Sequence, residues 1–382
     1  MTLALRLILA TLSIAIIGPS CTAQDLGAQI NAFGPAGTFS ITNGTYTVTT
    51  PISITQSGSQ TLHIVCSSRQ AVLNFSVTGN AISINGSRSP TAQVSIENCT
   101  LNGSSSAGDA IYAYDSQNLR LTNNSISGFT SGAGVHGYGM IGALLLGNNI
   151  SGNKYGIYLQ PDAANSFASN ANRVYGGSLT YDSVLNFWDE GNASVYGGDT
   201  SNTLDGVTFE SNTNVPQFLV EGTWNDAIIN SYIEYIGYPT SSGNLYAGIV
   251  GNLAGSGYGS NTTYPANSFR LDNVFFITPR AGSGSTTASI LAENTANLNI
   301  STITDEGAPT YFMAFSSAAD NVTATVGPSH VGWQVGQYLS PPPSASLWVG
   351  AVGIGLNCTG GQVVTNPVYV QGILTGGTCQ NP

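Results

Sequence analysis

The sequence predicts an all-β protein folded as a right-handed parallel β-helix, a solenoid of short strands with a short N-terminal cap and a C-terminal capping segment. Two observations lead to this prediction. Only 7% of the 382 residues are charged, and the polar residues are mainly Asn, Ser, Thr and Gly, which favour turns and strands over exposed helices. Short apolar segments ending in Asn-rich turns also recur every 24 to 25 residues, which is a typical length for one solenoid coil.

The first 23 residues are predicted to be a secretory signal peptide. They contain an early positive charge at Arg6, an apolar run over residues 7–18, and small residues before a cleavage position after Ala23. Acylation of Cys21 is the alternative interpretation. No other stretch reaches the roughly 18 apolar residues needed to span a membrane. We therefore expect a secreted or extracellular protein, with the periplasm or the cell surface as variants of that location.

The repeats follow an N-terminal cap and first coil over residues 24–60. The most regular ones lie at residues 94–101, 119–126 and 143–150. Asn after each strand suits a left-handed corner, because Asn tolerates that backbone conformation better than most residues. The sequence thus predicts a β-helix over residues 61–335, a Gly- and Ser-rich loop inserted at 239–265, and a C-terminal cap over 336–382.

Four cysteines follow the predicted signal peptide: Cys66, Cys99, Cys358 and Cys379. Export permits disulfides, and four cysteines allow three pairings. Pairing of nearest neighbours closes the shortest loops, so we expect Cys66–Cys99 and Cys358–Cys379. Buried free thiols are the alternative for Cys66 and Cys99, since both end apolar runs.

Residues 25–32, 44–46 and 51–54 resemble the entry to the pectate lyase-like (pectin lyase fold) superfamily, in which a capping segment leads into the first coil. Phe209-Glu210 and residues 229–234 are similar to tailspike-type and secreted members. The resemblance implies the β-helix fold over roughly residues 25–305. It carries over no catalytic residue, because only Val135-His136-Gly137 resembles a polygalacturonase motif and the other motifs of that family, of pectate lyases and of epimerases are missing.

Candidate catalytic acids come from aligning residues 179–182, 207–210 and 231–234. Strand alternation then predicts Tyr181, Phe209 and Ile233 facing inward, and it places three acids on one outer column: Asp182, Glu210 and Glu234. Stacked carboxyls of this kind suit glycosidic hydrolysis. Candidate substrate-binding residues near them are Trp188, Trp224 and Tyr232.

Three other interpretations stay open for these residues. The acids are solvated turn residues in the first, and they hold Ca²⁺ in the second, although no calcium motif is present and no other cofactor is expected. In the third, the protein is a lyase that uses Lys154 and Arg173, accompanied by Arg120, His136 and nearby tyrosines.

The formal net charge of −11 and the single Lys argue against binding to nucleic acid. The same charge repels polyuronates, so the expected partner is a neutral polysaccharide or a cell-surface glycan. The sequence therefore favours a secreted carbohydrate-active β-helix that cleaves glycosidic bonds by hydrolysis or β-elimination. The alternative is a noncatalytic glycan-binding or structural β-helix, and the oligomeric state is left open.

Overall fold

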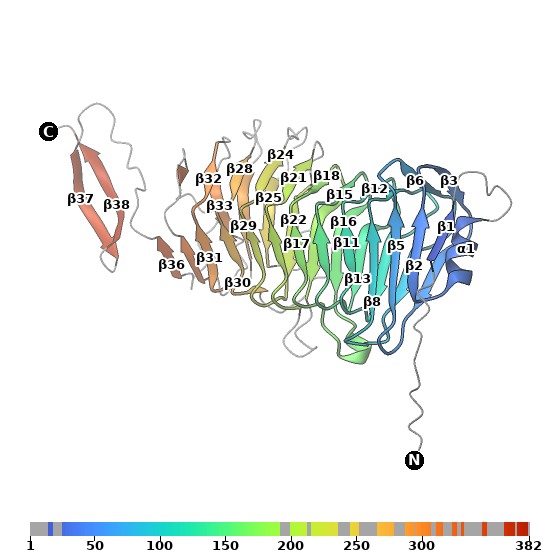
Figure 1. Ribbon diagram of the computed structural model, residues 1–382. Helices are drawn as coiled ribbons and strands as arrows, with labels where there is room; N and C mark the ends of the chain where they lie inside the picture. Colours follow the sequence, from blue (N-terminus) through green and yellow to red (C-terminus); the bar gives the residue numbers. More distant parts are fainter. Residues whose placement is uncertain are drawn as a thin grey trace, which may run out of the picture.

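A computed structural model describes residues 14–17, 25–191, 199–211, 215–235, 245–251, 266–278, 287–293, 295–306, 311–315, 323–326, 330–331, 346–349, 363–370 and 373–380. Over these residues the chain winds into a solenoid of three parallel sheets (Figure 1). Helix α1 (Leu26–Phe33) lies at the N-terminal end, and a single 3-10 turn, η1, spans Ala163–Asn165. The predicted all-β solenoid with a short N-terminal helix is confirmed.

Each complete coil contributes one strand to each sheet, in the order sheet 1, sheet 2, sheet 3. Sheet 1 holds β1 Ile14–Ile17, β2 Gly37–Ile41, β5 Thr61–Cys66, β8 Gln93–Glu97, β11 Arg120–Thr122, β14 Leu144–Leu146, β17 Arg173–Tyr175, β20 Thr203–Asp205, β23 Ala227–Ile229, β27 Arg270–Asp272, β31 Leu298–Ser301, β34 Thr323–Val326 and β36 Ser346–Val349. Sheet 2 holds β3 Gly44–Val48, β6 Ala71–Phe75, β9 Thr100–Asn102, β12 Ser125–Ser127, β15 Asn149–Ser151, β18 Ser178–Thr180, β21 Thr208–Ser211, β24 Tyr232–Tyr235, β28 Phe275–Ile277, β32 Thr304–Asp305 and β35 His330–Val331.

Sheet 3 completes the cross-section. It holds β4 Ile52–Thr55, β7 Ile82–Asn85, β10 Ile111–Tyr114, β13 Ala133–Tyr138, β16 Tyr155–Gln160, β19 Leu185–Glu190, β22 Phe218–Glu221, β25 Leu245–Val250, β29 Thr287–Ala292 and β33 Tyr311–Phe315. The short strands β26 Ala266–Asn267 and β30 Thr295–Ala296 pair with each other, and β37 Val363–Val370 and β38 Ile373–Gln380 form an antiparallel hairpin.

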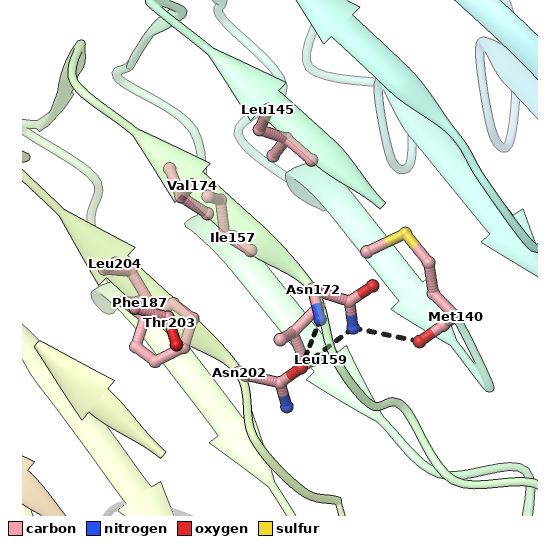
Figure 2. Close-up of a pocket in the computed structure, with 10 residues that line it drawn as sticks. All are labelled: Met140, Leu145, Ile157, Leu159, Asn172, Val174, Phe187, Asn202, Thr203 and Leu204. Atoms are coloured by element: carbon pink, nitrogen blue, oxygen red, sulfur yellow. Dashed lines mark hydrogen bonds between the residues drawn. The ribbon is translucent and has the colours of Figure 1, made fainter. Parts of the chain in front are cut away.

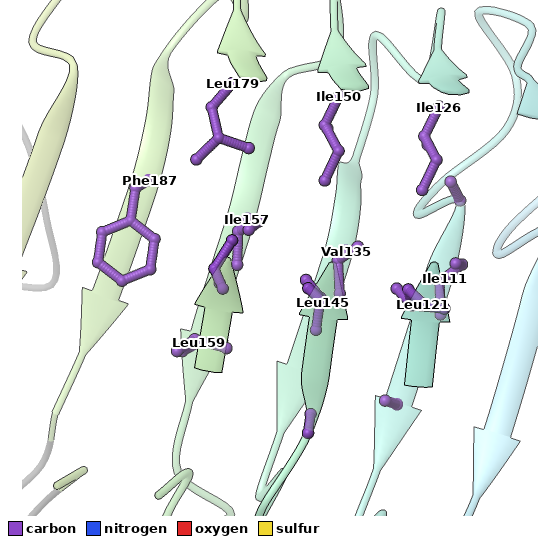
Figure 3. Packing of buried hydrophobic residues seen from close by; sticks show 14 of the residues in the cluster. Ile111, Leu121, Ile126, Val135, Leu145, Ile150, Ile157, Leu159, Leu179 and Phe187 are labelled. Atoms are coloured by element: carbon purple, nitrogen blue, oxygen red, sulfur yellow. The ribbon is translucent and has the colours of Figure 1, made fainter. Parts of the chain in front are cut away.

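The core is made of inward side chains stacked in register from coil to coil. Ile111, Val135, Ile157 and Phe187 are successive partners in sheet 3, and all four are buried. Figure 3 shows this row facing equivalent rows from sheets 1 and 2 across the interior. Because no single coil can bury its own apolar face, the stacking of coils supplies the core.

A two-residue corner joins sheet 1 to sheet 2 in eight consecutive coils. The first residue of each corner has a left-handed backbone with a positive φ, and the second is turned toward the interior. The left-handed residues are Asn98, Asn123, Gly147, Gly176, Gly206, Asn230, Asn273 and Thr302. Seven of the eight are Asn or Gly, as expected for positions where a Cβ is disfavoured. This confirms the predicted role of Asn at the corners.

Inward corner side chains hydrogen-bond to the backbone of the preceding coil. Asn124 Oδ1 accepts from the Cys99 amide at 2.9 Å, and Asn148 Oδ1 accepts from the Asn124 amide at 3.0 Å. The ladder stops at Gly177, where an added Cβ would lie 2.1 Å from the Asn148 carbonyl oxygen. Each rung satisfies a buried amide that would otherwise lack a partner.

The same column of corners contains the Cys66–Cys99 disulfide, with a Cα–Cα distance of 5.2 Å. The prediction of this pair is confirmed, and the alternative of buried free thiols is wrong. The disulfide joins two neighbouring coils, and the Asn ladder begins in the next coil, at Asn124. The proposed partner pair, Cys358 with Cys379, includes Cys358, which lies outside the described residues.

Part of the predicted 239–265 loop is a strand. Residues 245–250 form β25, which pairs with β22 and β29 inside sheet 3. The Gly and Ser on either side of this segment favour a loop over the strand that its apolar residues form. Residues 239–244 and 252–265 of the proposed loop lie outside the described residues. Of the predicted signal peptide only Ile14–Ile17 is described, as strand β1 beside β2, so the signal peptide, like the proposed cap over 336–382, stays a prediction.

Neither described helix is both long enough and apolar enough to cross a membrane.

Removing the disulfide with a Cys66→Ser, Cys99→Ser double substitution should lower the free energy of unfolding by about 4 kcal/mol, because the bond closes a 33-residue separation. Chemical denaturation followed by circular dichroism, with and without reductant, measures this. Reductant should destabilise the natural chain more than the double variant, which lacks this bond. Equal stability of the two oxidised proteins would contradict a stabilising role for the bond.

Candidate functional site

The predicted column of three acids is only partly right. Glu210 and Glu234 are direct register partners in sheet 2, as expected. Glu210, however, pairs on its other side with Thr180 and not with Asp182. Tyr181 has a left-handed backbone with φ 58° and ends the strand. The in-out alternation breaks at that residue, so Tyr181 is exposed and Asp182 is turned into the core.

Asp182 is a structural rung at the corner between sheets 2 and 3. Its Oδ1 accepts from the Asn153 amide at 2.7 Å, in the manner of the Asn ladder, while Oδ2 has no hydrogen-bond partner. Burial raises the pKa of this carboxyl well above its usual range. Asp182 is fully buried and does not reach the outer face that carries the other two acids.

Glu210 and Glu234 share the outer face of sheet 2 with two aromatic side chains. Tyr232 donates its hydroxyl to Glu234 Oε2, and its ring stacks on Phe275 with a centroid distance of 5.7 Å. Burial and the bond to Glu234 raise the pKa of Tyr232 to about 12. The Tyr232 hydroxyl is therefore a donor at neutral pH.

The other predicted site residues are divided among different faces. Arg173 lies on sheet 1, where Nη1 donates to the carbonyl oxygens of Asn172 and Ser201. Lys154 lies at the margin of sheet 3, with Nζ 5.0 Å from the centre of the Tyr155 ring. The proposed lyase pair is therefore separated. Trp224 is exposed at the corner between sheets 3 and 1, beyond the end of β22.

Trp188 belongs to an aromatic row that the sequence analysis did not assemble. Tyr112, His136, Tyr158 and Trp188 are successive register partners on the outer side of sheet 3. Their neighbouring ring centroids are 5.0, 4.6 and 4.3 Å apart. His136, Tyr158 and Trp188 stack face to face, whereas Tyr112 meets His136 edge-on at 74°.

Two further tyrosines widen the row toward the carboxyl ends of the strands. Tyr114 and Tyr138 stack at 5.7 Å, and both rings lie within about 30° of parallel to Tyr112. Together with Tyr155 beside Trp188, these side chains define the aromatic face of sheet 3. Its members are Tyr112, Tyr114, His136, Tyr138, Tyr155, Tyr158 and Trp188.

Hydrogen-bonding groups line the aromatic face. His136 Nδ1 lies 2.8 Å from Asp109 Oδ2, and Nε2 lies 3.3 Å from Gln160 Oε1. Tyr158 donates to Glu190 Oε2. Trp188 Nε1 donates to Glu221 Oε1 at 2.9 Å, and Glu221 is fully buried.

The segment around η1 packs against one margin of the face. Asn165 Nδ2 donates to Tyr114 Oη at 3.0 Å. Arg88 holds this segment through ion pairs with Asp115 at 2.9 Å and Asp162 at 3.6 Å, and its guanidinium lies 5.0 Å from the centre of the Phe167 ring. These contacts fix a wall beside the tyrosines.

The hydroxyls of Tyr112 and Tyr158 stay protonated at neutral pH. Burial raises the pKa of Tyr112 to about 12, with a further contribution from Tyr138 and Asp109. Burial and the Glu190 carboxylate raise the pKa of Tyr158 further. These hydroxyls are hydrogen-bond donors and poor general bases.

The aromatic face passes into a covered apolar patch at its C-terminal end. Leu219, Ile249 and Leu291 continue the line of Trp188 on the outer side of sheet 3, yet each is at most 4% exposed. They pack in a second hydrophobic cluster against Tyr155, Trp188 and other partly buried side chains. The accessible part of the row is therefore the β10–β19 part.

No group of three or more His, Cys, Asp or Glu side chains among the described residues has an arrangement that could hold a metal ion. An internal cavity of ≈ 10 Å³ lies between Leu159, Phe187 and the corner asparagines Asn172 and Asn202 (Figure 2). That volume holds no more than about one water. This cavity therefore offers no room for an organic ligand, and we take the outer aromatic face as the candidate site.

The described site could have been found by aligning a different set of repeats. Residues 111–112, 135–136, 157–158 and 187–188 each place an inward apolar residue before an outward aromatic residue. The spacing from His136 to Tyr158 is 22 residues, and from Tyr158 to Trp188 it is 30. This irregular spacing hid the row from a search for a fixed 24-residue period.

Comparison with known proteins agrees with this architecture. A family model described as "Right handed beta helix region" matches residues 62–178. No curated protein matches the chain in sequence.

Solved structures match over most of the chain at low identity. ORF18 of Geobacillus virus E2 has a TM-score of 0.55 at 11% identity, over 83% of this chain and 59% of that one. Tailspike protein 2 of Escherichia coli O157:H7 bacteriophage CAB120 has a TM-score of 0.49 at 12% identity, over 90% and 43%. The catalytic domain of a GH87 α-1,3-glucanase in complex with nigerose has a TM-score of 0.49 at 12% identity, over 88% and 68%.

The chain spans less than two thirds of the length of the two viral proteins. At such identities the likeness extends to the fold and not to the chemistry. Three stacked parallel sheets, the matching family model and the ORF18 structure together lead to one conclusion. The chain is a right-handed parallel β-helix with the pectin lyase-like fold.

Proposed function

We propose that the chain binds an uncharged extracellular polysaccharide along the aromatic face of sheet 3. The observation that carries the proposal is the line of Tyr112, His136, Tyr158 and Trp188 over four consecutive coils. A face that repeats from coil to coil suits a ligand that is itself a repeating chain. The Cys66–Cys99 disulfide supports an oxidising, extracellular location.

The chemistry of the face supports a sugar ligand. Tyrosine and tryptophan combine an apolar ring with a polar group, and a sugar ring presents C–H groups on its faces and hydroxyls at its edge. The protonated tyrosine hydroxyls supply donors, while Gln160, Asp109 and Glu190 supply acceptor oxygens. The C–H groups and the hydroxyls of a sugar ring therefore both have partners on the aromatic face.

The charges around the face favour an uncharged glycan. Asp109, Asp162 and Glu190 lie along it, and the Arg88 guanidinium beside it is already paired with Asp115 and Asp162. A polyuronate would meet these carboxylates at close range. β-Elimination also has little support, because the tyrosines hold their protons and Arg173 lies on sheet 1.

Replacing Tyr138 by Ala should weaken binding about twofold to tenfold, since an aromatic contact contributes roughly 0.5 to 1.5 kcal/mol. Affinity electrophoresis against a panel of neutral and acidic polysaccharides measures the change. Tyr175→Ala is the matched control, because Tyr175 is a 39% exposed tyrosine on sheet 1.

The control variant should bind like the natural chain. Equal loss in both variants, or binding only to the acidic polysaccharides, would contradict the assignment of an uncharged ligand to sheet 3.

Hydrolysis of a glycosidic bond at Glu210 and Glu234 is a second candidate function. The observation that favours it is their direct pairing on adjacent strands, which lie about 4.8 Å apart. Carboxyl groups of a retaining glycosidase are separated by roughly 5 to 5.5 Å. Asp182 is excluded from this pair by its burial in the core.

If this second function holds, Glu210→Gln should reduce the release of new reducing ends by at least about a hundredfold, because the amide cannot exchange a proton. Glu97→Gln on sheet 1 is the control and should retain full activity. Unchanged turnover in Glu210→Gln would remove this residue from the mechanism. An increase in absorbance from unsaturated sugars would show that the reaction is β-elimination and would contradict hydrolysis.

A further inference from the structure

Three buried carboxyl groups lie directly beneath the aromatic face. In β19, Trp188 and Glu190 point outward, and Asp189 between them points into the core with no exposed surface. Asp199 and Asp226 come from the neighbouring corners between sheets 3 and 1 and are 0% and 2% exposed. Asp189 lies within hydrogen-bonding reach of both other carboxyls.

One oxygen of each carboxyl has a donor from the corner ladders. Asp199 Oδ1 accepts from the Ser169 amide at 2.7 Å, and Asp226 Oδ1 accepts from the Asn202 amide at 2.7 Å. Asp189 Oδ2 accepts from Asn202 Nδ2 at 2.8 Å.

The second oxygen of each carboxyl is buried without a hydrogen-bond donor: Asp189 Oδ1, Asp199 Oδ2 and Asp226 Oδ2. The Thr223 side chain, 1% exposed, lies beside the Asp226 carboxyl.

The described charged groups on the packed elements do not neutralise the cluster. Glu190 on β19 and Glu221 on β22 are acidic themselves. Arg173 on β17 is turned to the outside of sheet 1, where it bonds to the Ser201 carbonyl oxygen and to Thr203 Oγ1. Three ionised carboxylates in contact inside a core are strongly unfavourable without a counter-charge. A protonated carboxyl, by contrast, donates the hydrogen bond that each neighbouring oxygen lacks.

We propose that Asp189, Asp199 and Asp226 form a buried proton-binding site, in which two shared protons link the three carboxyls and hold β19 in place beneath the aromatic face. Two O–H···O bonds, one donated by Asp226 to Asp189 and one donated by Asp189 to Asp199, connect all three groups. Loss of these protons places like charges in contact at Asp189, and the repulsion displaces its neighbours Trp188 and Glu190. The effect on glycan binding rests on the function proposed above, whereas the proton site itself does not.

The direction of the pH dependence follows from the burial of the site. Burial raises the pKa of all three carboxyls well above the usual range, and contact with Asp199 raises that of Asp189 further. The folded state thus holds protons that the unfolded chain releases at about pH 3.9. The protonated site therefore stabilises the fold fully below about pH 3.9. This stabilisation is lost as the pH rises through the pKa values of the three carboxyls in the folded chain.

Asp226→Asn tests the site with little steric change, because Asn172 and Asn202 already occupy the preceding rungs of the same ladder. The melting temperature of the natural chain should be higher at pH 5 than at pH 8 by about 3 °C or more. Asp226→Asn should melt higher than the natural chain at pH 8 and show a smaller difference between the two pH values. Asp272→Asn, on the partly exposed outer side of sheet 1, is the control and should keep the full difference.

The same pH difference in Asp226→Asn and in the natural chain would overturn the proposal. So would stabilisation of the natural chain by Ca²⁺ at pH 8 that is reversed by chelator, since a cation would then occupy the place assigned to protons. Infrared spectroscopy of the natural chain at pH 7 gives a test that needs no variant to fold. It should show the C=O stretch of protonated carboxyls, with Asp226→Asn reducing that signal, and absence of the signal contradicts the proposal.

Coupling to the aromatic face is measured with a polysaccharide that binds the natural chain. Its affinity should be higher at pH 5 than at pH 8, and Asp226→Asn should reduce that ratio. An unchanged ratio would disprove the coupling. If no polysaccharide binds, the proposed function fails, and the melting and infrared results still decide the proton site.

Discussion

The two-residue corner between sheets 1 and 2 is the constraint on which the rest of the structure depends. Its left-handed first residue turns the chain, and its second residue enters the core in eight consecutive coils. Because the corner length is constant, the strands on either side stay in register and the inward rows stack on one another. Side chains such as Asn124 and Asn148 then satisfy the amides that the turn leaves unpaired, at roughly 0.5 to 1.5 kcal/mol for each bond.

These corners made much of the fold predictable from sequence. Asn and Gly after short apolar segments indicated the turns, and the 24-residue spacing indicated the coils. The alternation rule correctly placed Phe209 and Ile233 inside. The nearest-neighbour argument also found the Cys66–Cys99 bond. In each case a local pattern was sufficient, because each coil contacts mainly the coils next to it.

The candidate site was less predictable because it depends on exact register across coils of unequal length. Asp182 looked equivalent to Glu210 by spacing, but the left-handed Tyr181 shifts it into the core. The aromatic face of sheet 3 escaped notice because the segment between β16 and β17 contains the extra η1 turn. The buried carboxyls could not be foreseen either, since Asp189 and Asp199 meet only when β19 and the following corner are folded together. Charge alone suggested a solvent-exposed position for each of them.

The account places the ligand on sheet 3, and oxidative footprinting of aromatic side chains tests this placement most directly. Hydroxyl-radical labelling with and without a bound polysaccharide compares tyrosines on all three sheets in one experiment. The account predicts protection of Tyr112, Tyr138 and Trp188, with unchanged labelling of Tyr175 on sheet 1 and Tyr232 on sheet 2. Protection confined to Tyr232 would contradict it and move the binding face to the Glu210–Glu234 pair.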